Sequence, residues 1–254
     1  MVKKIAYLTI DDAPSEDMKM KVDFLESKGI KAIWFCRGEL LSNKANQEAV
    51  IYAIRKGHII GNHAFDHPHF SKLSLEECFE QIKKTDELID SIYEMSEIKR
   101  PIKVFRFPYL DKGAGSVVEQ GWPEDRKEHI QAIQDFLKRL GYVQPKFEGI
   151  TYRWFLDAGL LKDVDVQPTY DTHDYSPFQD EPTHGIDSLE KVMERIEEDV
   201  PEECRGLNYP DSNEIIMMHD NAFTNRELSN KIFFAIIERL IEKGITFKLP
   251  ETND

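Results

Sequence analysis

The sequence predicts an α/β fold with a parallel sheet, either open or closed into a barrel, and two observations lead to that class. Strand-like and helix-like segments alternate from near the first residue to near the last, and no internal repeat or low-complexity linker interrupts them. Such alternation favours parallel strands joined by crossover helices. The chain has 254 residues, of which 41% are hydrophobic, so a single domain over residues 1–254 is long enough to bury a substantial core.

The first half of the chain has the clearest element signals. Lys4–Ile10 is apolar and rich in β-favouring residues, and two aspartates and a proline end it. Ser15 is placed to cap a helix that runs to about Lys28 and ends at Gly29. The same signals predict a strand over Lys31–Cys36, a helix over Gln47–Lys56 ended by Gly57, a strand over His58–Asn62, a helix from the capping box Ser74–Glu77 to about Met95, and a strand over Lys103–Phe105.

The second half is less regular. Asp125–Leu140 has the periodicity of an amphipathic helix, with Gly141 after it. Tyr142–Phe147 and Ile150–Phe155 have the composition of short strands. The remaining predicted elements are a strand over Val164–Tyr170, in which Pro168 marks an edge or a bulge, a helix over Asp187–Asp199, a strand over Glu214–His219, a helix over Asn225–Lys243 and a strand over Thr246–Leu249.

The charge and the cysteine content argue against several classes of function. The chain has 33 Lys and Arg against 47 Asp and Glu, a formal net charge of −14, which disfavours nucleic acid and anionic membranes as partners. No apolar stretch approaches the roughly 20 residues that span a bilayer. The N-terminal apolar run is too short for a signal-peptide core, so we expect a cytoplasmic protein. Cys36, Cys78 and Cys204 form no CxxC unit, which argues against a disulfide framework and a thiolate zinc site.

Ionisable residues follow the carboxyl ends of five predicted strands. In parallel α/β folds the working residues gather at that rim. They are Asp11 and Asp12 after the first strand, His63 and His67 after His58–Asn62, Arg106 after Lys103–Phe105, Asp171 and Asp174 after Val164–Tyr170, and His219 at the end of Glu214–His219. Their convergence on one rim predicts a catalytic site.

Each of these residues also has a purely structural interpretation when it is taken alone. An Asp-Asp pair before a proline is common turn chemistry. His63 and His67 are four residues apart, which places both imidazoles on one side if the backbone makes a helical turn there, yet such pairs are also common on surfaces. Arg106 alone would be an ordinary ion-pair partner, and His219 alone a buried core histidine.

Together the residues match the requirements of a hydrolytic metal site. Two imidazoles and one carboxylate form such a ligand set and leave positions open for water and substrate. Asp12, His63 and His67 supply that set. Asp66 and His69 lie nearby in the sequence and are further candidates for contact with the metal.

The other ionisable residues match the proton transfers that amide hydrolysis requires. Asp11 is adjacent to the proposed ligand Asp12 and is available as the base that accepts a proton from water. His219 is the available acid for the leaving group. Arg106 and Asp174 are candidates to hold the charge states of Asp11 and His219.

The segments that carry these residues resemble, in order, the five motifs of the polysaccharide deacetylases, which are also called carbohydrate esterase family 4 or NodB-homology enzymes. The segments are Thr9–Pro14, His63–Pro68, Arg106–Tyr109, Asp171–Tyr175 and Met217–His219. The resemblance extends from Ile5 to the last predicted strand. It implies a distorted (β/α) barrel, one divalent metal ion, usually zinc with cobalt or nickel as alternatives, and hydrolysis of an acetamido group on a sugar.

The resemblance also implies a role for each residue of the site. The implied roles are Asp11 as the catalytic base, Arg106 as its partner, Asp12, His63 and His67 as the metal ligands, Tyr109 as the oxyanion donor through its backbone N–H, and His219 as the catalytic acid with Asp174 tethering it.

The sequence departs from the family pattern at four positions. Ile10 and Ala13 replace the usual phenylalanine and glycine, and Tyr175 replaces the usual tryptophan. Ala64 stands where a Ser or Thr hydroxyl normally braces the histidine loop, so that bracing must come from elsewhere. The spacing between the third and fourth motifs is longer than in the family, which predicts an insertion over residues 111–165.

The resemblance makes an amino-sugar N-deacetylase the leading hypothesis, with an N-acetylated sugar or glycan as its partner. Relatives that act on chitin or peptidoglycan are typically exported, so a small N-acetylated sugar or an oligosaccharide fits a cytoplasmic protein at least as well as a polymer does. Two alternatives stay open. One is a hydrolase of linear or cyclic amides, imide- or allantoin-like, on the same fold, and the other is a non-catalytic sugar-binding protein with a relict site.

Overall fold

The computed structural model describes residues 4–115, 124–198, 206–209, 211–220 and 225–252. Within them the chain forms a parallel sheet of six strands in the order β3-β2-β1-β5-β4, with β6 also paired to β1. The strands are β1 (Ile5–Ala13), β2 (Ala32–Cys36), β3 (Ile59–Asn62), β4 (Tyr170–Asp171), β5 (Glu214–His219) and β6 (Thr246–Phe247).

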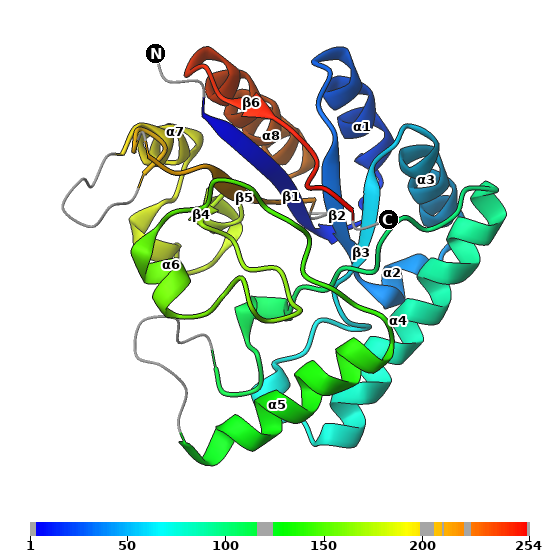
Figure 1. The fold of residues 1–254 in the computed structure, drawn as a ribbon. Coiled ribbons are helices and arrows are strands. Elements are labelled where there is room, and N and C mark those ends of the chain that lie inside the picture. The colour runs from blue at the N-terminus through cyan, green and yellow to red at the C-terminus, as the bar shows by residue number, and fades with distance from the viewer. Residues whose placement is uncertain (1–3, 116–123, 199–205, 210, 221–224, 253–254) are drawn as a thin grey trace.

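Helices cover the outside of this sheet, and neighbouring helices pack on one another: α1 on α3, α3 on α4, α4 on α5, and α7 on α8. Figure 1 shows the long α4 and α5 side by side. The helices are α1 (Met18–Ser27), α2 (Gly38–Leu41), α3 (Lys44–Arg55), α4 (Leu75–Ser96), α5 (Glu124–Arg139), α6 (Arg153–Asp157), α7 (Leu189–Glu197) and α8 (Arg226–Glu242), with 3₁₀ turns at Phe70–Lys72, Pro108–Leu110, Ser176–Phe178 and Thr183–Gly185.

The barrel closes through isolated bridges instead of a continuous ladder. Phe105 forms bridges with both Asn62 of β3 and Asp165, and the backbone N–H of Val166 donates to the carbonyl of Phe105 at 2.8 Å. From there the chain leads into β4, which pairs with β5. The predicted distorted (β/α) barrel is therefore confirmed, and its wall between β3 and β4 consists of single bridges.

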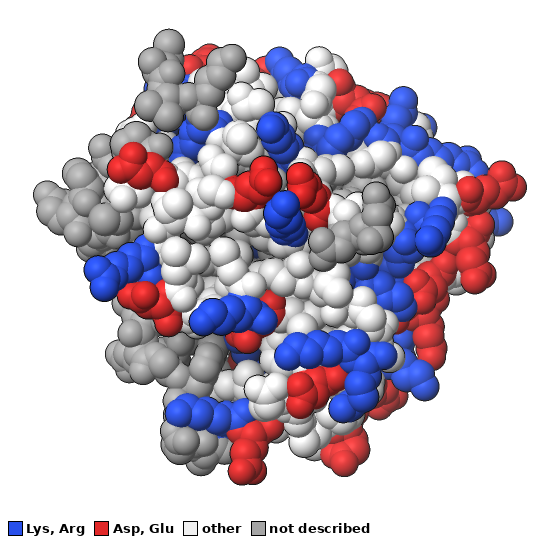
Figure 2. All heavy atoms as spheres, viewed as in Figure 1, with Lys and Arg blue, Asp and Glu red and all other residues white. Residues whose placement is uncertain are grey.

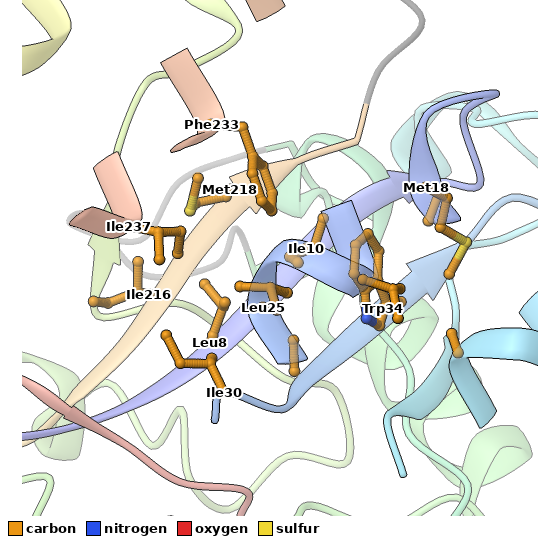
Figure 3. Close-up of a cluster of buried hydrophobic side chains, with 14 of the residues drawn as sticks. Leu8, Ile10, Met18, Leu25, Ile30, Trp34, Ile216, Met218, Phe233 and Ile237 are labelled. Carbon is orange, nitrogen blue, oxygen red and sulfur yellow. The ribbon is translucent and has the colours of Figure 1, made fainter. Parts of the chain in front are cut away.

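Alternate residues of β1 separate an apolar outer face from a polar interior, as the two-residue period of a strand requires. Leu8 and Ile10 pack in the main core, against α1 and α8 (Figure 3). Thr9 and Asp11 face the other way and both accept hydrogen bonds from Arg106. The interior of the barrel thus carries the ionisable groups to its rim.

Phe35 of β2 supports Arg106 from inside the barrel. Its ring centre lies 4.6 Å from the guanidinium carbon. Gly61 of β3 leaves the space for this ring, because a Cβ atom there would lie only 2.6 Å from Phe35 Cδ1.

The helix-start signals in the sequence were right at one site and wrong at another. The capping box is confirmed: Ser74 Oγ accepts from the backbone N–H of Glu77, whose carboxylate accepts from the backbone N–H of Ser74. Ser15, however, does not cap α1, whose N-cap residue is Asp17. The Ser15 hydroxyl instead donates to Asp220 at 2.6 Å, so it joins the ends of β1 and β5.

Several predicted strands are wrong in extent or in type. Lys103–Phe105 forms only isolated bridges, as does Tyr142–Phe147, and Ile150–Phe155 runs into helix α6. Within Val164–Tyr170 only the last residue is in a strand, since Pro168 has no N–H to donate to a ladder. These segments have the buried aromatic residues of strands but not the backbone pairing, and the short α2 was not predicted.

Buried polar contacts join the beginning, the helix α5 and the end of the segment predicted as an insertion, 111–165. Lys112 is 1% exposed and pairs with Asp163 at 2.5 Å and with Asp165 at 3.0 Å. Gln134 of α5 donates to the same oxygen of Asp165, Oδ1, at 2.7 Å. That this segment is an insertion between family motifs stays a prediction.

The surface carries charges of both signs. On the face drawn in Figure 2, Lys and Arg side chains alternate with Asp and Glu side chains and neither sign forms a continuous patch. None of the described helices is both long enough and apolar enough to cross a lipid bilayer. Cys36 and Cys78 are buried free thiols, while Cys204 and the predicted helix end at Asp199 lie outside the described residues.

His58 is held neutral at the start of β3. Its Nδ1 accepts hydrogen bonds from the Ala32 N–H and from Trp34 Nε1, each at 3.1 Å. Burial lowers the pKa of His58 from 6.5 to about 4, because the charged imidazolium is disfavoured in the core. As the pH falls, His58 therefore becomes protonated at a higher pH in the unfolded chain than in the folded chain.

We expect His58 to make folding stability fall as the pH falls. The contribution of neutral His58 to the free energy of unfolding is complete above pH 6.5 and is lost between pH 6.5 and 4. The expected loss between pH 7.5 and 5 is about 2 kcal/mol. Urea unfolding at these two pH values measures it. His58→Asn keeps an acceptor but does not titrate, so it should reduce the pH dependence by that amount. The same change at the exposed His184 is the control, and an equal pH dependence in wild type and His58→Asn would contradict the prediction.

Candidate active site

Asp11 and Asp12 end β1 and both line a cavity of about 1100 Å³ at the rim of the barrel. Adjacent residues of a regular strand point to opposite faces. Here the register between β1 and β2 shifts between Ile10 and Ala13, and Asp12 has a left-handed φ of 61°, which Asp adopts more readily than most residues. This bulge turns both carboxylates into the same cavity.

His63 and His67 follow β3 in an irregular loop and not in the helical turn that their spacing suggested. The φ angle is 61° at both Ala64 and His67, and the two imidazole centres are 5.1 Å apart. His63 Nδ1 lies 2.9 Å from the carbonyl oxygen of Arg106, so this nitrogen donates and Nε2 presents its lone pair to the cavity.

Asp12, His63 and His67 place three possible ligand atoms within 4.8 Å of one another. Oδ1 of Asp12 lies 3.8 Å from Nε2 of His63 and 3.1 Å from Nε2 of His67. This oxygen is buried and accepts no hydrogen bond from the described residues, which is costly for a carboxylate unless a cation neutralises it. The three residues therefore fit a divalent cation with open coordination positions.

The protonation states of the two histidines also fit metal binding, which needs neutral imidazoles. Burial lowers the pKa of His63 to about 4, against the opposing effect of Asp11. Burial, reinforced by the charge of Arg37, lowers the pKa of His67 to about 4. At pH 7 both side chains are neutral.

The other two candidate contacts, Asp66 and His69, lie outside this cluster. Asp66 is exposed. The ring of His69 stacks on that of Tyr109 with centres 3.9 Å apart, and its Nδ1 lies 3.6 Å from Asp111.

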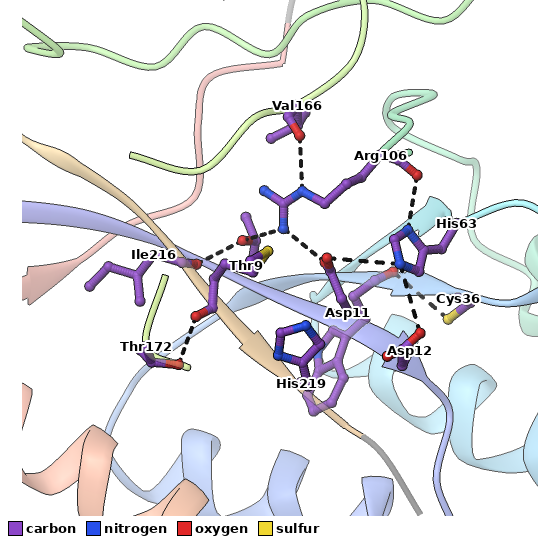
Figure 4. A network of polar contacts seen from close by, with 12 residues as sticks. Thr9, Asp11, Asp12, Cys36, His63, Arg106, Val166, Thr172, Ile216 and His219 are labelled. Carbon is purple, nitrogen blue, oxygen red and sulfur yellow. Dashed lines mark hydrogen bonds and ion pairs between the residues drawn. The ribbon is translucent and has the colours of Figure 1, made fainter. Parts of the chain in front are cut away.

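Arg106 and Asp11 form a buried ion pair beside the cluster (Figure 4). Arg106 Nη1 donates to Asp11 Oδ1 at 2.8 Å, and the other carboxylate oxygen lies 3.9 Å from His63 Nε2. Burial raises the pKa of Asp11, but the charge of Arg106, together with that of His219, outweighs burial, and the pKa is lowered overall. Asp11 is therefore ionised at neutral pH, as a base must be.

His219 lies beside Asp11 in register, on the neighbouring strand β5. Its Nδ1 is 2.7 Å from Asp174 Oδ1, and its backbone N–H donates to the other oxygen at 2.8 Å. Burial disfavours the imidazolium, but Asp174, Asp11 and Asp12 outweigh burial and raise the pKa of His219 to about 10. Neighbouring groups whose pKa values are moved apart suit an acid and a base.

Tyr109 also borders the cavity. It lies in the 3₁₀ turn after Arg106 with a φ of 56°, and the edge of its ring packs on His67 with centres 4.4 Å apart. The side chain is 50% exposed. The structure thus brings together all eight predicted site residues, with Arg106 and Asp174 behind the cavity wall, while the individual roles stay predictions.

Sequence reasoning missed the buried ion pair that holds the ends of β1 and β5 together. Asp220 accepts from Lys21 Nζ at 2.6 Å and from the Ser15 N–H at 2.7 Å, and its own N–H donates to the carbonyl of Asp11 at 2.8 Å. The side chains of Lys21 and Asp220 are at most 1% exposed. The available signal was the position of Lys21, a charged residue on the apolar face of α1 next to Val22.

Comparison with known proteins agrees with the first three sequence motifs, which lie within residues 1–120. The family model for polysaccharide deacetylase matches residues 1–120. The chain is 35% identical over 86 residues to a peptidoglycan-N-acetylglucosamine deacetylase of Bacillus cereus. That match covers 34% of this chain and 30% of the relative, so the chain spans less than a third of the relative's own length.

Solved structures share the fold over nearly the whole chain. The Xyl-CE4 domain of a multidomain xylanase, from the hindgut metagenome of Trinervitermes trinervoides, has a TM-score of 0.60 at 19% identity and covers 97% of this chain and 87% of its own. BA3943, a CE4 family pseudoenzyme from Bacillus anthracis, has a TM-score of 0.60 at 16% identity and covers 96% of this chain and 63% of its own. With the sequence motifs around one cavity, these likenesses lead to one conclusion: the chain has the fold of the CE4 structures, and its residues 1–120 match the polysaccharide deacetylase family.

Proposed function

We propose that the protein is a metal-dependent N-deacetylase that removes the acetyl group from an N-acetylated amino sugar, oligosaccharide or polysaccharide. The proposal is carried by one observation, the convergence of a three-ligand cluster, an Arg-paired carboxylate and an Asp-paired imidazole on one cavity. The Bacillus cereus relative, named for peptidoglycan N-acetylglucosamine, supports an acetamido sugar as the substrate class. We propose zinc as the cation, with cobalt and nickel as alternatives, and a cytoplasmic location.

In the proposed reaction, each residue around the cavity has a separate role in the hydrolysis of the amide. A divalent cation held by Asp12, His63 and His67 would lower the pKa of a water molecule and polarise the amide carbonyl. Asp11, kept ionised by Arg106, accepts a proton from the attacking water. The Tyr109 N–H donates to the oxygen that becomes negative.

His219 completes the reaction at the leaving group. Kept protonated by Asp174, it donates a proton to the amide nitrogen, the C–N bond breaks, and acetate and a free amine are released. Its place beside Asp11 on adjacent strands puts acid and base on the same side of the barrel.

An acetate-release assay tests the proposed function. Purified protein with added zinc, cobalt or nickel is incubated with N-acetylated sugars, chitin oligomers, imides and ureides, and acetate is measured. We expect acetate from the sugars and a loss of about 10²–10⁴-fold in Asp11→Asn, which keeps an acceptor for Arg106 but not a base. Asp135→Asn, at a half-exposed position of α5, is the matched control. Turnover of imides or ureides alone would favour the alternative of a linear or cyclic amide hydrolase. Metal binding without turnover of any substrate would favour the alternative of a non-catalytic protein with a relict site.

Metal affinity tests the ligand set without any substrate. Asp12→Asn keeps a residue that tolerates the left-handed backbone but removes the charge, so we expect the zinc Kd to rise by more than about 100-fold, beyond the effect of losing an outer partner. Isothermal titration measures it. Asp66→Asn, in the neighbouring loop and exposed, should leave the Kd unchanged. An equal loss in both variants would show that Asp12 is not a specific ligand.

The pH profile tests the role of His219. Asp174→Asn removes the main charge that raises the pKa of His219, so that pKa falls and the acid form is lost at lower pH. We expect the alkaline limb of kcat/KM to move to lower pH. Asp180→Asn, at an exposed position outside the cavity, is the matched control and should leave that limb in place. An unmoved limb in Asp174→Asn would show that His219 is not the acid.

A further inference from the structure

The loop that carries both histidine ligands is fixed on one side by the segment after β2. The carbonyls of Ala64 and Phe65 accept from the backbone N–H groups of Gly38 at 2.9 Å and Glu39 at 2.8 Å. Gly38 permits this approach, because a Cβ atom there would lie 3.2 Å from the Cα of Phe65. The backbone of the loop is therefore in direct contact with α2.

The opposite side of the loop is held by two side-chain carbonyls. Asn62 Oδ1 accepts from the N–H of Ala64 at 2.9 Å. Gln81 Oε1, from α4, accepts from the N–H groups of both Phe65 at 2.9 Å and Asp66 at 3.1 Å. These two amides immediately precede His67 in the chain.

The shape of this loop is one that a chain does not adopt without support. Ala64 and His67 both have a φ of 61°, and a left-handed residue other than glycine costs of the order of 1–3 kcal/mol unless its surroundings stabilise it. Ala64 has no hydroxyl to brace the loop from within, as the sequence indicated. The contacts of Asn62 and Gln81 supply that bracing from outside.

We propose that Gln81 is a positioning residue of the metal centre, which fixes the Phe65–Asp66 backbone and thereby the place of His67 Nε2 opposite Asp12. The inference rests on the proposed metal-dependent function. Gln81 is partly buried and does not line the cavity, so it acts through the loop and not on the substrate. Outer partners that orient a ligand commonly change metal affinity by about 10–100-fold.

Zinc binding by three variants tests this role. Gln81→Met keeps the length of the side chain but removes Oε1, and we expect the zinc Kd to rise about tenfold. Gln81→Glu keeps an acceptor oxygen, and we expect its Kd to stay within about twofold of wild type. Gln131→Met, at an exposed position of α5, is the matched control and should leave the Kd unchanged. Competition with a chromophoric chelator measures each Kd without substrate, and melting temperatures verify folding.

Two results would overturn the inference: a wild-type Kd in folded Gln81→Met, or a Gln81→Glu variant as weak as Gln81→Met. If Gln81→Met is too unstable to titrate, Gln81→Asn withdraws the carbonyl from the loop and serves for the same comparison. Acetate release is measured separately. The expected order of Kd values in a protein that releases no acetate would support the role of Gln81 and refute the deacetylase. Acetate release by the wild-type protein together with an unchanged zinc Kd in folded Gln81→Met would support the deacetylase and refute the role of Gln81.

Discussion

The buried guanidinium of Arg106 is the contact on which the rest of the molecule depends. Its Nε donates to the carbonyl of Val166 at 2.9 Å, its Nη1 donates to Thr9 and Asp11 at 2.8 Å each, and the backbone carbonyl of Arg106 accepts from His63. One residue thus joins β1, the loop after β3 and the irregular wall before β4. Because a buried charge left without its partner costs about 3–5 kcal/mol, closure of the barrel and ionisation of the base depend on the same group.

Much of the fold could be predicted from the sequence because the central strands are buried on both faces and the helices have clear starts and stops. β5 has the predicted bounds, and α4 begins at the predicted capping box. The wrongly predicted strands fall between Lys103 and Tyr170, where buried aromatic and polar side chains replace backbone ladders. Local composition does not distinguish a buried residue in a strand from one in an irregular segment.

The membership of the site was predictable, because each residue follows a strand and parallel strands end at one rim. Its geometry was not. The spacing of His63 and His67 suggested a helical turn, whereas a loop with left-handed residues brings them together, and the bulge at Asp12 depends on a register shift that no motif encodes. Lys21 and Gln81 were missed because their partners belong to other elements of the fold: Asp220 is 199 residues from Lys21, and the two loop amides are 15 and 16 residues from Gln81.

The single-bridge wall between β3 and β4 has a consequence for how such a protein can diversify. A continuous ladder couples the length of every strand to its neighbours, but isolated bridges at Phe105 impose no such coupling. Helices can be added or lost between Arg106 and Asp165 without changing the register of β1, β2 and β5, provided that the Val166 carbonyl still meets the guanidinium. The single-bridge wall is therefore the place where this architecture can acquire new surface for recognising different molecules while its reactive centre is inherited intact.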